Sequence, residues 1–179
     1  MKPLSRARGV TLIEVLIALV IVSIGLLGIA KMQALAIAST RGSSTRSLIA
    51  IEAASLAAAM HADRTYWANV ATASTTFSAS VSNGVITAAT DGALTSQSAN
   101  CVSTSCSGVA MAAYDLSAWS AAINKVTNGA AATVACSGAA VACTITVTWQ
   151  ENMVGMNAST QYASGQQTQT LSYALLVQP

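Results

Sequence analysis

The sequence is poor in charge and in aromatic side chains. Of its 179 residues, 14 are charged (8 Lys or Arg and 6 Asp or Glu), one is His, and Phe, Trp and Tyr together number 8. After Arg64 the charged residues are Asp91, Asp115, Lys125 and Glu151. This composition excludes a charge-driven disordered chain and a basic nucleic-acid-binding domain.

The residues that could carry chemistry do not form a catalytic set. The chain has one His, no Gly-rich phosphate-binding loop and no clustered carboxylates, so no acid–base or nucleophilic group can be assembled from it. His61 lies near Asp63 and Arg64 in a helical pattern, where a surface ion pair is a better interpretation than a metal site. We therefore expect a protein that is not an enzyme and has no cofactor or metal.

Apolar residues, in contrast, make up 53% of the chain, and 37 residues are Ala. The 21-residue run from Val10 to Ala30 contains a single charge, Glu14. A helix of this length spans about 30 Å, the thickness of the hydrocarbon core of a bilayer. Because Lys2, Arg6 and Arg8 precede the run, the N-terminus is expected in the cytoplasm and the rest of the chain beyond the membrane.

A specific string surrounds Glu14. Arg-Gly-Val-Thr-Leu-Ile-Glu, residues 8–14, follows the short basic leader and enters the apolar run; it resembles the processing signature of type IV prepilins. The resemblance implies that a prepilin peptidase removes residues 1–9 by cutting between Gly9 and Val10, and that Val10 is then N-methylated. It also implies that Glu14 is the assembly residue. Cleavage creates a cationic amine, and the Glu14 of a neighbouring subunit can neutralise it when subunits stack in register.

Removal of residues 1–9 would change the charge balance of the chain. The leader carries 3 of the 8 basic residues, so the mature chain would have 8 − 3 = 5 basic against 6 acidic side chains. The basic balance of the full sequence therefore belongs to targeting and does not indicate a partner.

Helical periodicity continues past the apolar run. Residues 10–30 are predicted to form a transmembrane and assembly helix, and residues 31–69 a helical stalk. Residues 39–47 (STRGSSTRS) weaken the helix, because Gly costs about 1 kcal/mol relative to Ala and Ser and Thr compete for backbone hydrogen bonds. We expect a kinked or frayed helix there, and a helix that stretches within a filament remains an alternative.

Residues 70–179 are predicted to form a head domain rich in Ser, Thr, Ala and Gly. Asn83-Gly84 is a turn signal between two short apolar runs. A helix is expected over residues 107–128, with Ser107 as its N-cap. Alternating apolar residues predict strands over 132–136, 142–149 and 168–177. Apart from this turn signal, residues 71–100 match no family pattern, and residues 151–167 are a polar loop.

All four cysteines lie in this head, where three pairings are possible. Loop closure is easiest between near neighbours, which predicts disulfides Cys101–Cys106 and Cys136–Cys143. A zinc site is the rival hypothesis. The cysteine spacing and the oxidising compartment expected outside the inner membrane argue against zinc.

Three motifs in the head extend the resemblance. They are Cys-x4-Cys at 101–106, Asp-Leu-x-x-Trp at 115–119 and Cys-Thr-Ile-Thr-Val-Thr-Trp-Gln-Glu at 143–151. Together with the N-terminal string, they resemble PilV-type minor pilins, the type IV pilus modification proteins. The resemblance implies an α+β pilin-like fold. A long N-terminal helix, half membrane-spanning and half stalk, would pack on a small antiparallel sheet with a second helix.

The same resemblance implies a role and a location. The chain would prime or cap a type IV pilus together with other minor pilins and the major pilin. It would lie first in the inner membrane, with its head in the periplasm, and later at the pilus tip outside the cell. No nucleic-acid partner is expected for the head alone, because one Lys and no Arg follow Arg64.

Two other functions remain open at this point. A tip adhesin could bind ligands through the polar loop 151–167. A minor pseudopilin of type II secretion would share the leader and the anchor.

Overall fold

We describe a computed structural model of the chain, covering residues 9, 11–73, 76–98, 100–137, 142–152 and 168–179. The chain divides into two units, Met1–Arg41 and Gly42–Pro179. Helix α1 (Leu12–Ala62) contributes residues to both units. The second unit therefore contains part of the predicted stalk together with the predicted head, and residues of that part of α1 belong to its core.

Helix α1 is continuous through residues 39–47, where the sequence predicts fraying. Thr40 bonds its hydroxyl to the carbonyl oxygen of Ala36, at 2.9 Å, so its side chain does not displace the helical backbone. Later in this segment, Arg46 is tied to Glu151 of the head. The expectation of a frayed helix is therefore wrong, because α1 runs through the whole segment and two of its side chains make the contacts just described.

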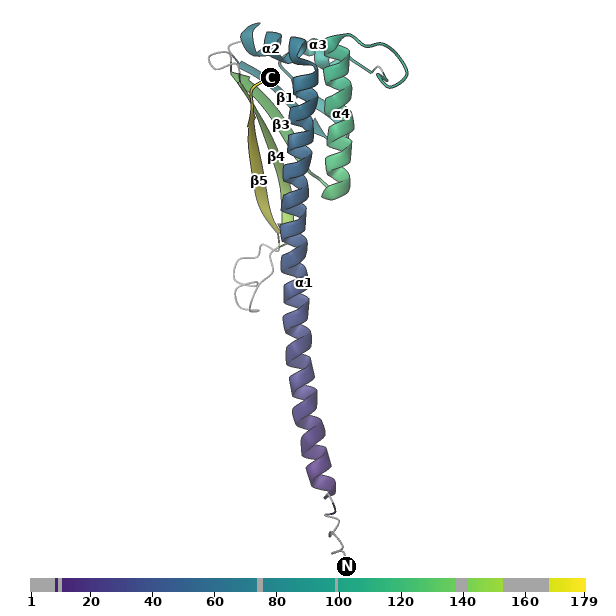
Figure 1. The fold of residues 1–179 in the computed structure, drawn as a ribbon, viewed down its shortest axis with the longest axis vertical. Coiled ribbons are helices and arrows are strands. Elements are labelled where there is room, and N and C mark those ends of the chain that lie inside the picture. Colours follow the sequence, from purple (N-terminus) through teal and green to yellow (C-terminus); the bar gives the residue numbers. More distant parts are fainter. Residues whose placement is uncertain (1–8, 10, 74–75, 99, 138–141, 153–167) are drawn as a thin grey trace, which may run out of the picture. The chain divides into compact units, whose positions relative to one another are not determined.

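Five strands form one antiparallel sheet in the order β2-β1-β3-β4-β5 (Figure 1). Strands β1, β3, β4 and β5 contain the Ser/Thr-rich and alternating segments of the head, and β4 and β5 are the longest. The bounds are β1 Thr76–Ser82, β2 Val85–Ala89, β3 Ala131–Ser137, β4 Ala142–Asn152 and β5 Thr168–Val177. The three strands predicted from alternation are confirmed.

The β1–β2 hairpin turns at the Asn83-Gly84 signal. Both residues have positive φ, 50° at Asn83 and 78° at Gly84, as a type I′ turn requires. The ladder then shifts its register between Ser80 and Val81, which is a bulge that increases local twist.

Three further helices belong to the head: α2 (Arg64–Ala73), α3 (Gly92–Thr95) and α4 (Gly108–Val126). Asp91 caps α3 by accepting a hydrogen bond from the backbone N–H of Ala93. Ser107 caps α4 by accepting one from Ala110. The predicted second helix and its N-cap are confirmed.

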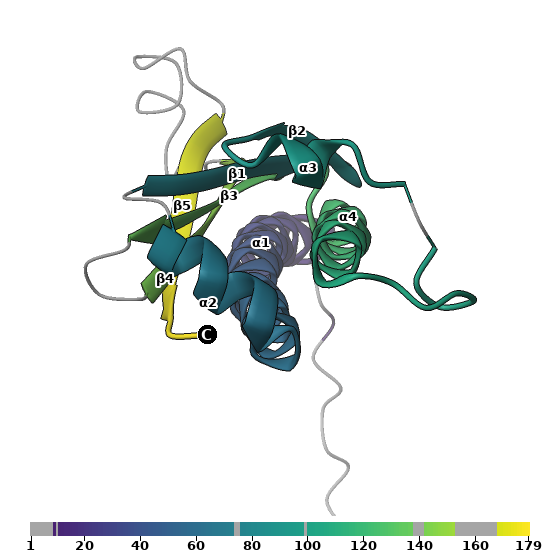
Figure 2. The ribbon, with the colours of Figure 1, turned by 90° about the horizontal axis from the view of Figure 1, so that it is seen from above.

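The core lies between one face of the sheet and the helices α1 and α4, which lie on the same side of it (Figure 2). In β4 the buried residues alternate with the threonines, so that one face enters the core and the other is hydroxylic. The part of α1 within residues 42–62 buries Ile49, Ala53, Leu56 and Met60 at helical spacing. Trp119 of α4 is buried and its Nε1 donates to the carbonyl oxygen of Glu52, at 2.7 Å. This arrangement confirms the α+β class, with a long N-terminal helix and a small antiparallel sheet.

Candidate functional site

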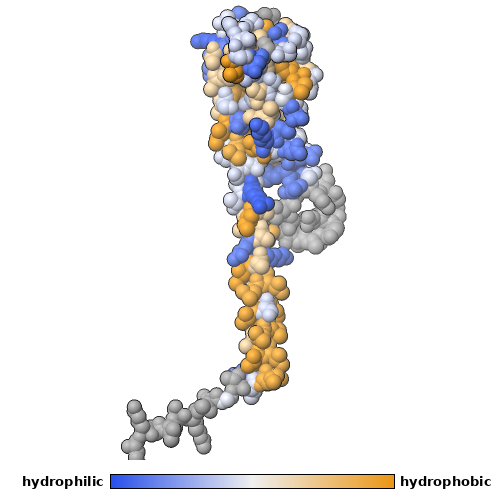
Figure 3. Space-filling model, turned by 90° about the vertical axis from the view of Figure 1, so that its right-hand side faces the viewer, coloured by the Kyte–Doolittle hydropathy of each residue, from blue (hydrophilic) through white to orange (hydrophobic). Residues whose placement is uncertain are grey.

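The N-terminal part of α1 is apolar on all sides. Its large apolar side chains between Leu12 and Ile29 are each 48–79% exposed, and Figure 3 shows how densely they cover this stretch. A helix that is hydrophobic all round is typical of a membrane span or a buried core, and these residues are not buried. In the described part of the chain, α1 is long and apolar enough to cross a membrane. The segment fits a single-pass membrane anchor.

Glu14 lies in the first turn of α1. The helix starts after Thr11, whose carbonyl oxygen accepts the backbone N–H of Glu14 at 3.1 Å and of Val15 at 3.3 Å. A carboxylate in the first turn is favoured by the partial positive charge of the helix N-terminus. The Glu14 side chain is exposed, so it is available to a group on another molecule.

Gly9 and Val10 flank the predicted cleavage point. A Cβ added at Gly9 would meet no atom within 4 Å, so no contact within the described chain requires glycine there. Val10 lies outside the described residues, and its methylation stays a prediction.

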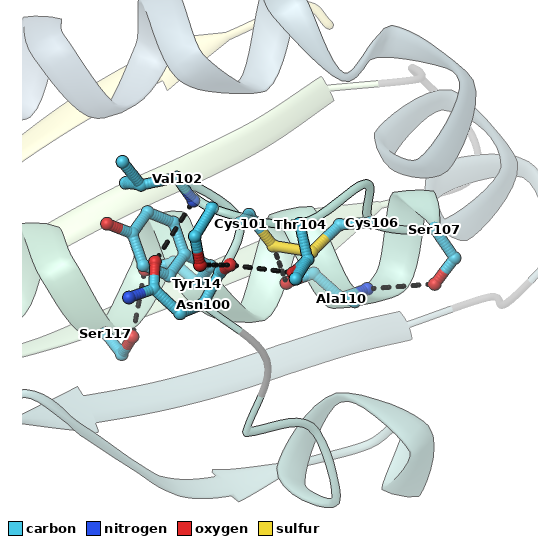
Figure 4. Close-up of a disulfide and its surroundings, with 10 residues drawn as sticks. Asn100, Cys101, Val102, Thr104, Cys106, Ser107, Ala110, Tyr114 and Ser117 are labelled. Atoms are coloured by element: carbon cyan, nitrogen blue, oxygen red, sulfur yellow. Dashed lines mark hydrogen bonds between the residues drawn. A yellow bond between two sulfur atoms is a disulfide. The ribbon is translucent and has the colours of Figure 1, made fainter.

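The first disulfide joins Cys101 and Cys106 in the loop before α4 (Figure 4). Asn100 organises this loop: its Oδ1 accepts the backbone N–H of Val102 at 3.1 Å, and its carbonyl oxygen accepts the hydroxyl of Thr104 at 2.9 Å. The bridge thus fixes a small surface loop that already has local hydrogen bonds.

The second disulfide joins Cys136 of β3 to Cys143 of β4, directly opposite each other in the ladder. Cys136 is 4% and Cys143 0% exposed, so this bridge belongs to the core. The structure therefore has the same two pairs that local loop closure predicts.

A polar corner of the head is built from Asp63, Tyr66 and Asp91. The Tyr66 hydroxyl donates to Asp91 Oδ2 at 3.0 Å, and the backbone N–H of Tyr66 donates to Asp63. Asp63 directly precedes α2, which begins at the next residue, and its Oδ2 is buried without a hydrogen-bond partner among the described residues. These three residues line a cavity of about 710 Å³, whose apolar wall includes Phe77 and Val70.

Burial sets the ionisation of this corner. Burial raises the pKa of Asp63, and the hydrogen bond from the Tyr66 backbone opposes this in part. The pKa of Asp115 is raised by burial and then by the nearby charge of Asp63. Burial also raises the pKa of Tyr66, and its bond to Asp91 adds to the effect. Among the described residues the structure shows no ion pair of Asp63 with His61 or Arg64, so the ion pair expected there does not form for Asp63.

One tie between α1 and the sheet was not predicted from the sequence. Arg46 bonds Glu151 through Nε at 3.2 Å and Nη2 at 3.3 Å. Gly42 lies against the same carboxylate, and a Cβ there would collide with Glu151 Oε1. The two ends of this contact are 105 residues apart, and no local signal relates them.

Within the described residues, no group of three His, Cys, Asp or Glu side chains is placed to hold a metal ion. The polar loop that could bind ligands begins at Glu151, but residues 153–167 lie outside the described part of the chain. The described residues with a candidate functional role therefore lie in the N-terminal segment and in the disulfide-bonded head.

Comparison with known proteins gives one match. Residues 4–30 match the family described as the prokaryotic N-terminal methylation motif. No curated protein and no solved structure matches the chain. The matched residues include Gly9, Val10 and Glu14 and continue into the apolar part of α1. The motif supports a type IV prepilin-like chain, in the class that contains pilins and pseudopilins.

Proposed function

We propose that this chain is a minor pilin that takes part in type IV pilus assembly as a non-enzymatic structural subunit. The observation that carries the proposal is the methylation motif at residues 4–30, which leads directly into the all-round apolar segment of α1. A chain of this design is held in the inner membrane until it is assembled, with its head in the periplasm. PilV-type minor pilins, which the head motifs resemble, prime or cap the filament.

The mechanism depends on the one charge in the apolar segment. A carboxylate inside a membrane helix costs about 2.5 kcal/mol or more when it has no partner. Cleavage after Gly9 would create a cationic α-amine at Val10, four residues before Glu14. When two subunits stack in register, the Glu14 of one neutralises the amine of the other, and both buried charges are satisfied. Out of register, both remain unpaired, so the pair selects the axial position.

The partners follow from this mechanism. Prepilin peptidase acts first, and other minor pilins and the major pilin supply the matching amines and carboxylates. The head then travels from the periplasm to the pilus tip outside the cell. A pseudopilin of type II secretion would use the same N-terminal chemistry, so the partner set distinguishes the two functions.

Substitution at Glu14 tests the proposal. We expect Glu14→Gln, which keeps the size but removes the charge, to leave leader cleavage intact and to reduce incorporation into the assembled pilus fraction at least about tenfold, as the loss of about 1.4 kcal/mol would. Cleavage and methylation are read by mass spectrometry of the N-terminus, and incorporation by quantifying the protein in sheared filaments.

A matched control is Ser23→Ala, which changes a polar residue of the same segment whose hydroxyl bonds the carbonyl oxygen of Leu19. It should assemble normally. Normal incorporation of the Glu14→Gln protein would refute the register mechanism. Co-purification of the wild-type chain with secretion components and not with pilus subunits would assign it to the pseudopilins.

A further inference from the structure

The two edges of the sheet differ in how well they are protected. β2 forms one edge and β5 the other. β2 has 5 residues, is paired through a shifted register, and has α3 packed beside it (Figure 2). Short length, bulges and a covering element are the usual means by which proteins prevent further strand pairing. The β2 edge is therefore closed.

The β5 edge has none of these protections within the described residues. The strand is 10 residues long, Thr-Gln-Thr-Leu-Ser-Tyr-Ala-Leu-Leu-Val, and contains no charged residue and no Pro. It pairs with β4 without a shift from Thr168 to Val177. No described element lies beyond it in Figure 1. Alternate residues of an edge strand direct their backbone N–H and C=O groups away from the sheet, ready to pair.

The core also remains open at this edge. The core-facing side chains of β4 are 0–4% exposed, but those of β5 at Leu171, Tyr173 and Leu175 are only partly buried. On the opposite face Leu176 is 67% exposed. A further strand beside β5 would cover this apolar row and pair the outward backbone groups at once.

We propose that the β5 edge binds an extended, uncharged segment of a different protein subunit by strand addition. The segment would alternate apolar side chains, which extend the core row, with small or hydroxylic ones on the outer face. A charged segment is disfavoured, because β5 offers no opposite charge to pair with it. Strand addition is a binding mode that goes beyond the pilus role proposed above. The choice of a different subunit as the partner rests on the membrane anchoring assumed in that role.

The geometry argues against a second copy of this chain as the occupant. Residues 42–62 of α1 and strand β5 run in the same direction (Figure 1). Antiparallel pairing of two β5 strands would place residue 42 of the two copies at opposite ends of the pair, although both chains are proposed to enter the head from one membrane. Two copies in the same orientation would instead bring β2 to the β5 edge, and β2 is the closed edge.

The test uses the full-length chain in lipid nanodiscs and a synthetic peptide with the β5 sequence. This peptide is uncharged and, from Leu171 to Leu175, alternates apolar side chains with small or hydroxylic ones, as the proposal requires. Ala174→Lys places a charge on the exposed outer face of the edge strand, whereas Ala135→Lys places it on the same face of the interior strand β3. Binding is followed by fluorescence anisotropy of the labelled peptide and by hydrogen exchange of β5 amides. Circular dichroism checks that both variants fold, and Ser172→Lys replaces Ala174→Lys if that variant does not.

We expect the peptide to slow exchange in residues 168–177, the edge variant to weaken binding at least about tenfold, and the β3 variant to bind like the wild type. Absence of binding or of protection in β5, or an equal loss in both variants, would overturn the proposal. So would a dimer of the full chain, seen by native mass spectrometry without peptide, that is lost in the edge variant. Failure of the pilus role would appear separately, as normal filament incorporation of the Glu14→Gln protein.

Discussion

The glycine in the middle of α1 allows a quantitative test of the contact between this helix and the sheet. Gly→Ala in a helix interior ordinarily stabilises by about 1 kcal/mol. At Gly42, however, the new Cβ would collide with Glu151 Oε1, so the Glu151 carboxylate must move and its bond to Arg46 is lost. The Arg46 side chain is 58% and the Glu151 side chain 23% exposed, so this pair contributes at most about 1 kcal/mol. The two effects oppose each other, so Gly42→Ala alone should stabilise the chain by less than the usual value of about 1 kcal/mol.

A double-mutant cycle separates the two effects. Glu151→Ala removes both the obstacle and the ion pair, so Gly42→Ala in that background should recover the full stabilisation of about 1 kcal/mol. Arg46→Ala serves as the control, because it removes the ion pair and leaves the collision in place.

The free energies come from urea unfolding of the detergent-solubilised chain, followed by far-ultraviolet circular dichroism. The expected coupling between positions 42 and 151 is stabilising in the Glu151→Ala background and at most about 1 kcal/mol. If Gly42→Ala stabilises equally in both backgrounds, Gly42 is not held against Glu151, and the argument that glycine is needed for this close approach fails.

Three further outcomes follow from the head. Burial places the folded-state pKa of Asp63 above its unfolded value, so its contribution to stability is full below the unfolded pKa and is lost as pH rises through the folded pKa. Asp63→Asn, which keeps the side-chain size, should therefore stabilise relative to wild type increasingly as pH rises above the unfolded pKa of 3.8 in thermal melts. Replacing Cys136 and Cys143 by Ala should cost about 2.5 kcal/mol from loop entropy, or more because both are buried, in urea unfolding. Trp119→Phe removes the donor to the Glu52 carbonyl oxygen and should cost about 1–2 kcal/mol in the same assay, while reduced exchange protection around residue 52 locates the loss.

The local parts of the fold follow from the sequence because short-range physics determines them. Asn83-Gly84 can adopt positive φ at both positions, which fixes the hairpin. Ser107 provides the acceptor that starts α4. Alternation in β4 and β5 predicts which side chains enter the core. In each case the residues that carry the signal are close together in the chain.

Long-range contacts are the part that the sequence could not predict. Trp119 binds the Glu52 carbonyl oxygen across 67 residues, and Arg46 binds Glu151 across 105. The second contact involves Arg46, within residues 39–47, where the helix is continuous although local propensity favours fraying. Gly42 therefore gives a misleading signal in isolation: it weakens the helix locally but makes room for the carboxylate that ties the helix to the sheet.

The candidate site divides in the same way. The N-terminal motif is a contiguous string, so its residues can be located from the sequence, and the match to residues 4–30 covers Gly9 and Glu14. The open β5 edge, in contrast, exists only because β5 is the last strand in the sheet order. The same ten residues in the middle of the sheet would have both sides paired.

The scarcity of charge links these features. Each charged residue after Arg64 has an identified position or contact within the head. Asp91 caps α3, Asp115 lies near Asp63, Lys125 lies in the last turn of α4, and Glu151 pairs with Arg46. None of them lies on β5. Proteins ordinarily keep an exposed edge strand from pairing by placing charge on it, and this chain places its few charges elsewhere. A charge added at Ala174 should therefore leave the fold intact and impair only the pairing of β5 with a partner, which is the combination expected of an interface and not of a stabilising surface.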